Sequence, residues 1–435
     1  MKAKCAYYGK CSGCTLQQFP YVKQLHDKSR RVSSDLHALL PNAARAEDLI
    51  QSVVPSPLDQ GYRTSGKLCL HEDELGRKSI GLYERGSKKV VSIPGCTVHH
   101  PEINKLVQRL FGFGKKLPAP FYHHAKKGFQ PGKLKFVVLR YSPETKEFGL
   151  VISHTGVSRD DLKSWASGLN LSHVSFYDTE LKESDGDLVM ARGTTHLAGP
   201  KTFRFQIGEE SFAIDPIAFF QANHSLAPRF IETIAAWHKG DRLLDLYGGF
   251  GTYSLAAKDN FSGIAIVEAN PHAMDSAKEW THRLGTKHIT THALSVEDYF
   301  KGALKKDDVR RITDIIINPP RTGISRTVIE GLRSPKLVGL ERLTYVSCEL
   351  GTLKRDLREI IRDGLFVIDE VIPFDMFPQT EHIETVVRLK RRMPIVGTVS
   401  EKKPSLSAPR GQLSNSSRER PAPRSGQANH RRRNP

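Results

Sequence analysis

The stretch at residues 242–257, "RLLDLYGGFGTYSLAA", decides the fold of this chain. An apolar run that contains one acidic residue leads into a cluster of glycines, and a helix-like apolar segment follows at once. Glycine lets the backbone turn tightly and approach a ligand closely, so this order predicts a strand, a tight turn and the start of a helix. The stretch therefore indicates the first strand–helix unit of an α/β domain.

Apolar, β-branched runs recur downstream of this unit, and helical patterns separate most of them. In the segment 353–361 the apolar residues fall on one helical face. Alternating strands and helices are typical of a mostly parallel, doubly wound sheet, so a Rossmann-like domain is predicted for residues 206–392. Its strand candidates are 243–247, 264–268, 314–318, 344–348, 365–368 and 385–389.

The glycine turn favours a nucleotide-like cofactor. A dinucleotide fingerprint would carry a third glycine where Ser254 stands. Asp245 lies inside the first strand instead, and Glu268 ends the second, where an acidic residue is placed to bind the two hydroxyls of a ribose. With Gly249 and Gly251 in the turn and no pyrophosphate to hold, these residues indicate S-adenosylmethionine. The alternative is a structural tight turn with a surface glutamate.

Four strand candidates end in a polar or reactive residue, namely Tyr247, Glu268, Asn318 and Cys348. Ligands of open α/β sheets bind outside the carboxyl ends of the strands, so these side chains are expected at one site. Asn318 begins an Asn-Pro-Pro-Arg sequence, and its amide offers a donor and an acceptor. It suits the edge of uracil or an exocyclic amine, and a turn-capping role is the alternative.

Cys348 is either an inert packing residue or a nucleophile. A helix begins just beyond it, and a helix N-terminus favours the thiolate. The neighbouring Glu349 would oppose ionisation of the thiol, unless it turns away or a cation such as Arg321 compensates for it. Glu384, at the entry to the last strand, is expected at the same edge and is a candidate acid or base. Of two further candidates nearby, Glu381 is expected in solvent and His382 in a structural or substrate-edge position.

The rest of the chain divides into three regions. Residues 1–35 hold clustered cysteines and a charged helical segment. Residues 36–205 read as short strands, with a hairpin turn at Pro143, and predict a β-rich domain that binds RNA. Residues 393–435 are rich in Ser, Pro and Arg, which predicts a disordered basic tail.

Composition narrows the class of protein. The formal net charge of +18 favours a polyanionic partner such as nucleic acid. No apolar run approaches the roughly 20 residues of a membrane helix, and no apolar leader opens the sequence, so a soluble cytoplasmic protein is expected.

The cysteines suggest a metal centre. Cys5, Cys11 and Cys14 follow a C-x5-C-x2-C spacing, and Cys96 is a fourth cysteine further along the chain. Clustered cysteines in a cytosolic chain point to metal binding or catalysis rather than to disulfides. Four thiolates suit a [4Fe–4S] cluster, and zinc fits the ligand count as well. Cys69 matches no motif and is expected to pack in the core.

The motifs together resemble one family. In chain order they are "IDPIAFFQANHSLAPRFI", "LLDLYGGFGTYSL", "INPPRTGI", "YVSCELGTLKRDL" and "FDMFPQTEHIETVVRL", and they resemble the RNA uracil-C5-methyltransferases. The stretch "CAYYGKCSGCTLQQFPYVKQL", with the later "SIPGCTVHH", is similar to the iron–sulfur segment of the ribosomal-RNA members. The Asn-Pro-Pro-Arg form, and a first cysteine with no TRAM domain before it, are most similar to the short 23S rRNA type. The resemblance runs from Cys5 to about residue 390.

The resemblance implies a class I S-adenosylmethionine-dependent methyltransferase that forms 5-methyluridine in RNA. It implies 23S rRNA as the substrate, where a loop uridine is expected because its base leaves the stack at the least cost; a monomer is also expected. Cys348 would attack C6 of uracil and Glu384 would act as the base. Residues implied around S-adenosylmethionine and the target base are Gln221, Tyr247, Glu268 and Asn318. Those implied as ligands of a [4Fe–4S] cluster are Cys5, Cys11, Cys14 and Cys96.

The sequence departs from the family pattern at two places. Gly248 stands where cysteine is usual, and Glu349-Leu350 stands where Asn-Pro is common. The first change is expected to be harmless, and the second affects the turn beside Cys348. Two other functions fit parts of the pattern: an exocyclic-amine methyltransferase built on Asn-Pro-Pro, and a non-catalytic RNA-binding iron–sulfur protein.

Overall fold

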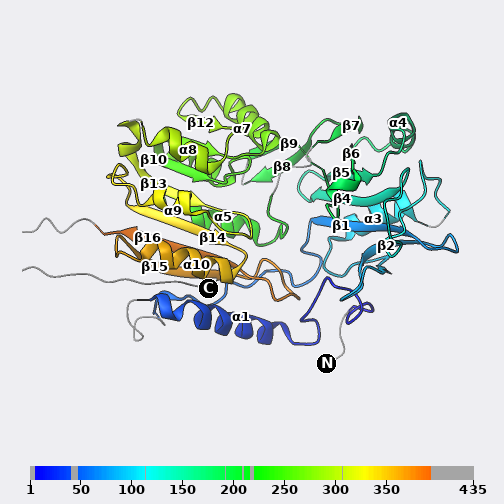
Figure 1. The fold of residues 1–435 in the computed structure, drawn as a ribbon, viewed down its shortest axis with the longest axis horizontal. Coiled ribbons are helices and arrows are strands. Elements are labelled where there is room, and N and C mark those ends of the chain that lie inside the picture. Colours follow the sequence, from blue (N-terminus) through cyan, green and yellow to red (C-terminus); the bar gives the residue numbers. More distant parts are fainter. Residues whose placement is uncertain are drawn as a thin grey trace, which may run out of the picture. The chain divides into compact units, whose positions relative to one another are not determined.

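Seven strands form the sheet that the glycine turn predicts (Figure 1). Their order is β12-β11-β10-β13-β14-β16-β15. The five strands from β12 to β14 are parallel, whereas β16 runs antiparallel to both β14 and β15. Their bounds are β10 Gly240–Leu246, β11 Phe261–Val267, β12 Ile289–His292, β13 Ile312–Ile317, β14 Arg342–Ser347, β15 Phe366–Phe374 and β16 Glu384–Arg391.

All six predicted strands are present, and the mostly parallel Rossmann-like sheet is confirmed. The short edge strand β12 was not predicted, because "ITTH" carries one large apolar residue and no alternation. β15 ends at Phe374, six residues beyond the predicted end at 368.

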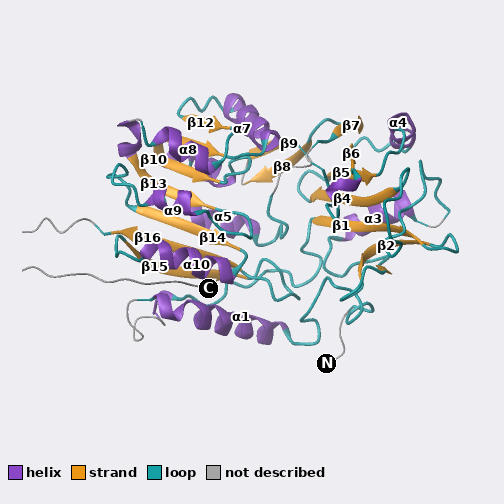
Figure 2. Cartoon of the chain, in the orientation of Figure 1, coloured by secondary structure: helices purple, strands orange, loops and turns teal. Residues whose placement is uncertain are grey.

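Successive strand residues point to opposite faces of the sheet and build two apolar cores. Leu244, Ile315 and Ile317 belong to one core, and the neighbouring Leu243 and Ile316 belong to the other. Helices cover both faces, as expected for a doubly wound fold (Figure 2). On the Leu243 face lie α5 Ala227–Ala235, α6 Thr252–Ala256 and α7 Pro271–Arg283; on the other lie α8 Val296–Ala303, α9 Arg326–Leu332, α10 Leu350–Ile361 and α1 Tyr21–Leu36.

A second seven-stranded sheet has the order β3-β2-β1-β4-β5-β6-β7 and confirms the β-rich character of the central region. The predicted turn at Pro143 joins β4 and β5, whose ends pair Ser142 with Glu147. Its elements are β1 Ser65–Glu72, β2 Lys78–Tyr83, β3 Val90–Ser92, α3 Pro101–Phe111, β4 Leu134–Ser142, β5 Glu147–His154, α4 Arg159–Gly168, β6 Val174–Glu180 and β7 Thr195–Ala198. The remaining elements are a hairpin, β8 Phe203–Ile207 and β9 Glu210–Ile214, and short 3-10 turns at His37–Leu39, Glu183–Asp185, Lys258–Asn260 and Asp307–Arg311.

The structure, a computed structural model, describes residues 5–40, 48–112, 114–191, 193–207, 210–215, 220–305 and 307–392. The predicted tail 393–435 lies outside these residues. No helix within the described ranges has the length and apolar character needed to cross a membrane.

Candidate active site

The four predicted strand-end residues occupy equivalent positions in the sheet. Tyr247, Glu268, Asn318 and Cys348 are each the first residue after a parallel strand, namely β10, β11, β13 and β14. Because parallel strands end at the same edge, one edge of the sheet receives all four residues, as the sequence predicts.

Glu384 reaches this edge from the opposite direction. It is the first residue of β16, and the antiparallel register pairs Thr385 with Ser347, the residue before Cys348. The first residue of β16 therefore lies beside the end of β14. Glu384 is buried, and burial raises the pKa of its carboxyl to about 8, while the charge of Arg321 opposes the shift.

The Cys348 thiol is subject to two opposite charges, those of Glu384 and Arg321. Burial raises its pKa above the usual range, and the charge of Glu384 raises it further. The Arg321 guanidinium acts against both, because it carries a positive charge and hydrogen-bonds the Cys348 side chain. Arg321 is thus a cation that lowers the cost of a thiolate at this position, although the pKa of Cys348 stays above its usual value.

The loop that carries Arg321 is fixed by α10. The Thr352 hydroxyl donates a hydrogen bond to the carbonyl oxygen of Arg321 at 3.1 Å. The Arg355 guanidinium donates to the carbonyl oxygen of Thr322 at 2.8 Å. The helix that begins after Cys348 therefore also holds the Asn-Pro-Pro-Arg loop against it.

Glu349 does not oppose the thiol in the way its charge suggested. It is the N-cap of α10, and its carboxylate accepts a hydrogen bond from the backbone N–H of Gly351 at 3.4 Å. Its backbone N–H donates to the Ser347 hydroxyl at 3.1 Å. An acidic residue at a helix N-terminus is stabilised there by the free N–H groups, so Glu349 replaces the usual sequence at this turn by capping the helix.

Tyr253 is a site residue that sequence reasoning missed. Its hydroxyl accepts a hydrogen bond from the Asn318 amide at 3.4 Å and also hydrogen-bonds the Gln221 side chain. Burial raises its pKa, and the charges of Glu384 and Asp245 act in the same direction. Tyr253 therefore connects Asn318 to Gln221 within the site. In the sequence it reads only as an apolar residue of the helix after the glycine turn.

The glycine turn and the second strand meet as predicted. The backbone N–H of Gly249 donates to Glu268 at 3.2 Å, and that of Asn270 donates to the other oxygen at 2.8 Å. Gly251 has a φ of +88°, and a Cβ there would come within 2.6 Å of the Ile266 side chain. The turn therefore needs glycine at this position.

Asp245 is buried beneath the turn. The Ser254 hydroxyl donates to its Oδ2 at 2.7 Å. Burial raises the pKa of the carboxyl to about 7. Its Oδ1 is also buried and has no hydrogen-bond partner among the described residues. A Cβ at Gly248 would come within 3.0 Å of this carboxyl group, so in this chain the glycine that replaces the usual cysteine makes room for Asp245.

Tyr247 lies apart from the chain of hydrogen bonds around Tyr253. It adopts a φ of +56° and lines a cavity of about 710 Å³ with Pro320 and Asp356. Its ring packs against the core on the α10 face of the sheet.

The four predicted ligand cysteines line one cavity of about 220 Å³. Burial raises the pKa of Cys14 to about 11, the Gln17 side chain opposes this by hydrogen bonding, and the other three thiols add to it. Across the described part of the chain, no three His, Cys, Asp or Glu side chains are grouped closely enough to hold a metal ion. The structure thus gathers the thiols without showing a metal site. Cys69 packs in the core, as predicted.

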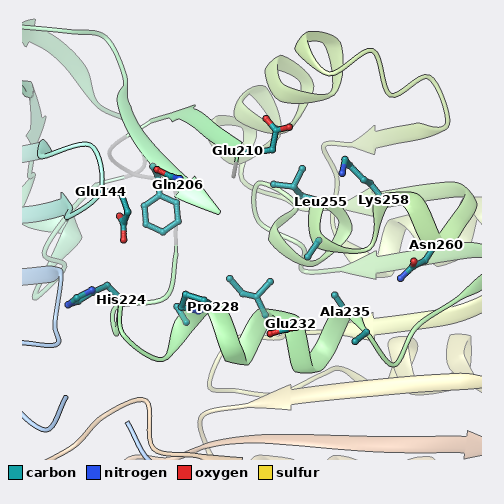
Figure 3. Close-up of a pocket in the computed structure, with 15 residues that line it drawn as sticks. Glu144, Gln206, Glu210, His224, Pro228, Glu232, Ala235, Leu255, Lys258 and Asn260 are labelled. Atoms are coloured by element: carbon teal, nitrogen blue, oxygen red, sulfur yellow. The ribbon is translucent and has the colours of Figure 1, made fainter. Parts of the chain in front are cut away.

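Another cavity, of about 690 Å³, lies away from the predicted residues (Figure 3). Side chains of α5 line one side, with Gln206, Leu255 and Lys258 across from them. None of the predicted catalytic, cofactor or cysteine residues lines it, so we do not assign the reaction to this cavity.

Known proteins resemble this chain in sequence and in fold. Residues 200–392 match a family model described as tRNA (uracil-5-)-methyltransferase. An uncharacterized RNA methyltransferase of Thermotoga maritima is 30% identical over 397 residues, which cover 89% of this chain and 84% of the relative. An uncharacterized RNA methyltransferase of Geobacter sulfurreducens is 29% identical, and the alignment covers 90% of this chain and 77% of the relative.

Among solved structures, the fold resembles that of Pyrococcus abyssi tRNA (uracil-54, C5)-methyltransferase in complex with S-adenosyl-L-homocysteine. The TM-score is 0.67, with 24% identity over 88% of this chain and 86% of that one. The sheet and these relatives define an RNA methyltransferase. Within that class, the chain belongs to the RNA uracil-C5-methyltransferase family.

Replacement of Arg321 by alanine is expected to lower the reactivity of Cys348. The variant loses a positive charge that acts on the thiol; because Arg321 is exposed and screened by solvent, the loss is about 1 kcal/mol, or roughly fivefold in thiolate population. The rate of iodoacetamide alkylation at the Cys348 peptide, followed by mass spectrometry from pH 7 to 10, measures this. The comparison is best made with Glu384→Gln present in both proteins, because Arg321 also acts on Glu384.

Arg326→Ala is the matched control, since this arginine is highly exposed and pairs with Glu330. It removes the same charge from α9. Equal alkylation profiles for all three proteins would contradict the role of Arg321.

Proposed function

We propose that this protein is an S-adenosylmethionine-dependent enzyme that forms 5-methyluridine in 23S rRNA. The observation that carries the proposal is the placement of Cys348, at the end of β14, beside the buried Glu384 at the start of β16, with the charge of Arg321 acting on both groups. A nucleophile, its activating cation and a separate base are the groups that methylation of uracil C5 requires.

The reaction needs a nucleophile because C5 of uracil attacks electrophiles poorly. The Cys348 thiolate adds to C6, and the C5=C6 electrons move toward the carbonyl, so that C5 becomes nucleophilic. S-adenosylmethionine, when bound, supplies the methyl group that C5 takes. Glu384 then accepts the C5 proton, the C–H electrons restore the double bond, and the thiolate leaves. The cysteine returns to its thiolate form, and Glu384 becomes a carboxylate again once it releases the proton to solvent.

The residues at the glycine turn fit S-adenosylmethionine. Glu268 is held by two backbone N–H groups and keeps acceptor capacity for ribose hydroxyls. The free Oδ1 of Asp245 offers a buried acceptor, and Gly249 and Gly251 let the backbone approach. We assign these residues, with Gln221 and Tyr247, to cofactor binding.

Asn318 hydrogen-bonds Tyr253, and Tyr253 in turn interacts with Gln221 and with the charges of Asp245 and Glu384. The Asn318 amide is suited to read the N3–H and a carbonyl of the target base. The base must leave its stack to reach Cys348, which costs least for an unpaired loop uridine.

Replacement of the Cys348 thiol and replacement of the Glu384 carboxyl are expected to block different steps of the reaction. Cys348→Ala is expected to abolish 5-methyluridine formation and the covalent adduct with RNA. Glu384→Gln should still form the adduct and transfer the methyl group, but a methylated protein–RNA adduct should accumulate, because removal of the C5 proton slows by about 10²–10⁴-fold. Denaturing gels with labelled RNA and labelled methyl groups measure both.

The pH dependence separates the two roles. Glu384 and Cys348 must both be ionised. Wild-type turnover is therefore expected to rise with pH through about 8, the pKa of Glu384, and to go on rising at higher pH, because the pKa of Cys348 lies above its usual value. Since the Glu384 charge raises the pKa of Cys348, adduct formation by Glu384→Gln should begin at lower pH than in the wild type. Glu381→Gln, an exposed neighbour, is the control. Methylation by Cys348→Ala would instead favour an exocyclic-amine methyltransferase.

We assign the substrate to 23S rRNA because the four gathered cysteines are similar to those of the ribosomal members. Mass mapping of 5-methyluridine in rRNA and tRNA from a deletion strain tests this. Loss of one or more 23S sites, with tRNA unchanged, is expected. If tRNA lost its 5-methyluridine and 23S rRNA kept it, the rRNA assignment would be wrong.

We propose a [4Fe–4S] cluster at Cys5, Cys11, Cys14 and Cys96. Four thiols around one cavity fit such a cluster, and the Asn104 amide fixes Cys96 through both its backbone N–H and carbonyl oxygen. Protein purified without oxygen is expected to contain about four iron and four sulfide per chain; stoichiometric zinc would overturn the assignment. All six cysteines are free thiols, which suits the expected reducing cytoplasm.

We also propose that the enzyme acts as a monomer.

A further inference from the structure

The loop at residues 375–383 joins β15 to β16 and leads directly into Glu384. It has no regular secondary structure beyond turns. The position of the Glu384 carboxylate therefore depends on what holds this loop. The contacts come largely from the first 31 residues of the chain, which are more than 340 positions away in sequence.

Gln379 is the centre of these contacts. Its carbonyl oxygen accepts hydrogen bonds from the backbone N–H groups of Thr15 and Leu16, both at 3.0 Å. Its own N–H donates to the Gln24 side chain at 3.0 Å, and the Gln24 amide donates back to its side-chain oxygen at 3.0 Å. Gln379 has a φ of +70°, a left-handed conformation that side chains rarely adopt, so these bonds hold it in an unfavourable backbone state.

Gln24 connects three segments through one buried amide. The two hydrogens of its NH2 group are shared among three acceptors, since the carbonyl oxygens of Leu16 and Phe19 lie at 3.1 and 3.0 Å from the same nitrogen. The side chain is 1% exposed, on the face of α1 that packs against the fold. Because the oxygen and the NH2 group of the amide are both used, no residue of other chemistry reproduces this set of bonds.

Two basic residues of α1 extend the contact along the loop. The Lys28 ammonium group is buried and lies 2.5 Å from the Asp375 carboxylate, and it also donates to the carbonyl oxygen of Phe377 at 3.2 Å. Arg31 donates to the carbonyl oxygen of Glu381 at 2.9 Å. The loop is thus held at its beginning, middle and end by one helix.

The same segment reaches the cysteine cavity. Gln17, the neighbour of Leu16, accepts a hydrogen bond from the Cys5 backbone N–H at 3.1 Å and hydrogen-bonds the Cys14 side chain. It also donates to the Thr97 hydroxyl, next to Cys96, at 3.3 Å. The hydrogen bonds of Gln17, its peptide link to Leu16 and the bond from Leu16 to Gln379 therefore connect the cysteine cavity to the loop that leads into Glu384.

We propose that Gln24 and Gln379 are positioning residues for Glu384, through which the N-terminal cysteine segment sets the geometry of proton removal from C5. This inference rests on the proposed role of Glu384 as the base. Neither glutamine contacts the reacting atoms. Displacement of a catalytic group by about 1 Å is enough to slow a reaction by roughly 10²-fold, so loss of these bonds is expected to act on the step that Glu384 performs.

The test is Gln24→Ala in the full-length protein. It is expected to lower kcat by roughly 10- to 100-fold while the KM values for RNA and S-adenosylmethionine change less than about twofold. The methylated RNA adduct should accumulate, as in Glu384→Gln, and hydrogen exchange at 375–383 should speed up. Gln24→Glu keeps the acceptor for Gln379 but puts a second oxygen against three acceptor oxygens, so it should not restore the rate.

Val22→Ala is the matched control, since Val22 is 77% exposed on the same helix. Arg31→Ala removes an exposed contact to the loop and covers the case in which Gln24→Ala does not fold. It should show the same adduct accumulation to a smaller extent.

Unchanged kcat and adduct level in both Gln24→Ala and Arg31→Ala would overturn the inference, and so would a rise in KM for RNA alone, which would mean that the segment docks RNA. Failure of the proposed function is distinct from either result. In that case the wild type itself would form no adduct with 5-fluorouridine RNA, and Glu384→Gln would resemble the wild type.

Discussion

The antiparallel insertion of β16 between β14 and β15 is the constraint on which the site depends. In a wholly parallel sheet, the start of the last strand would lie at the opposite edge from the ends of the others. The reversed strand brings its first residue, Glu384, beside Cys348, with the register fixed where Thr385 pairs with Ser347. Since a shift of one residue would turn every side chain of β16 to the other face, the two buried cores hold that register.

Burial at this edge has an electrostatic cost that one arginine offsets in part. Cys348 and Glu384 both have raised pKa values because burial disfavours their anions, and Arg321 opposes both shifts. A carboxyl with a raised pKa stabilises the fold only while it is protonated, and that contribution fades as the pH rises from its ordinary range through about 8. The base therefore costs stability at the pH where it works, as expected of a functional group held in an unfavourable setting.

Contacts from the N-terminal segment stabilise the loop that leads into Glu384. Hydrogen bonds from Gln24 and the buried Lys28–Asp375 pair hold a loop whose central residue, Gln379, has an unfavourable φ. A left-handed non-glycine residue persists only where its surroundings determine it. The helix α1 thus belongs to the methyltransferase core as well as to the cysteine segment, since Val32 and Leu36 pack in that core.

The sequence by itself determined the α/β fold and the edge that carries the site. Local patterns specify these: apolar, β-branched runs mark the strands, glycine marks the turn at 248–251, and the residue after each parallel strand falls at one edge. Only the tertiary structure decided that β16 runs backwards, that Tyr253 joins Asn318 to Gln221, and that Glu349 caps α10 instead of facing the thiol. The hold of Gln24 on Gln379 also came only from the fold, because a buried amide between residues 355 positions apart leaves no periodic or compositional signal in the sequence.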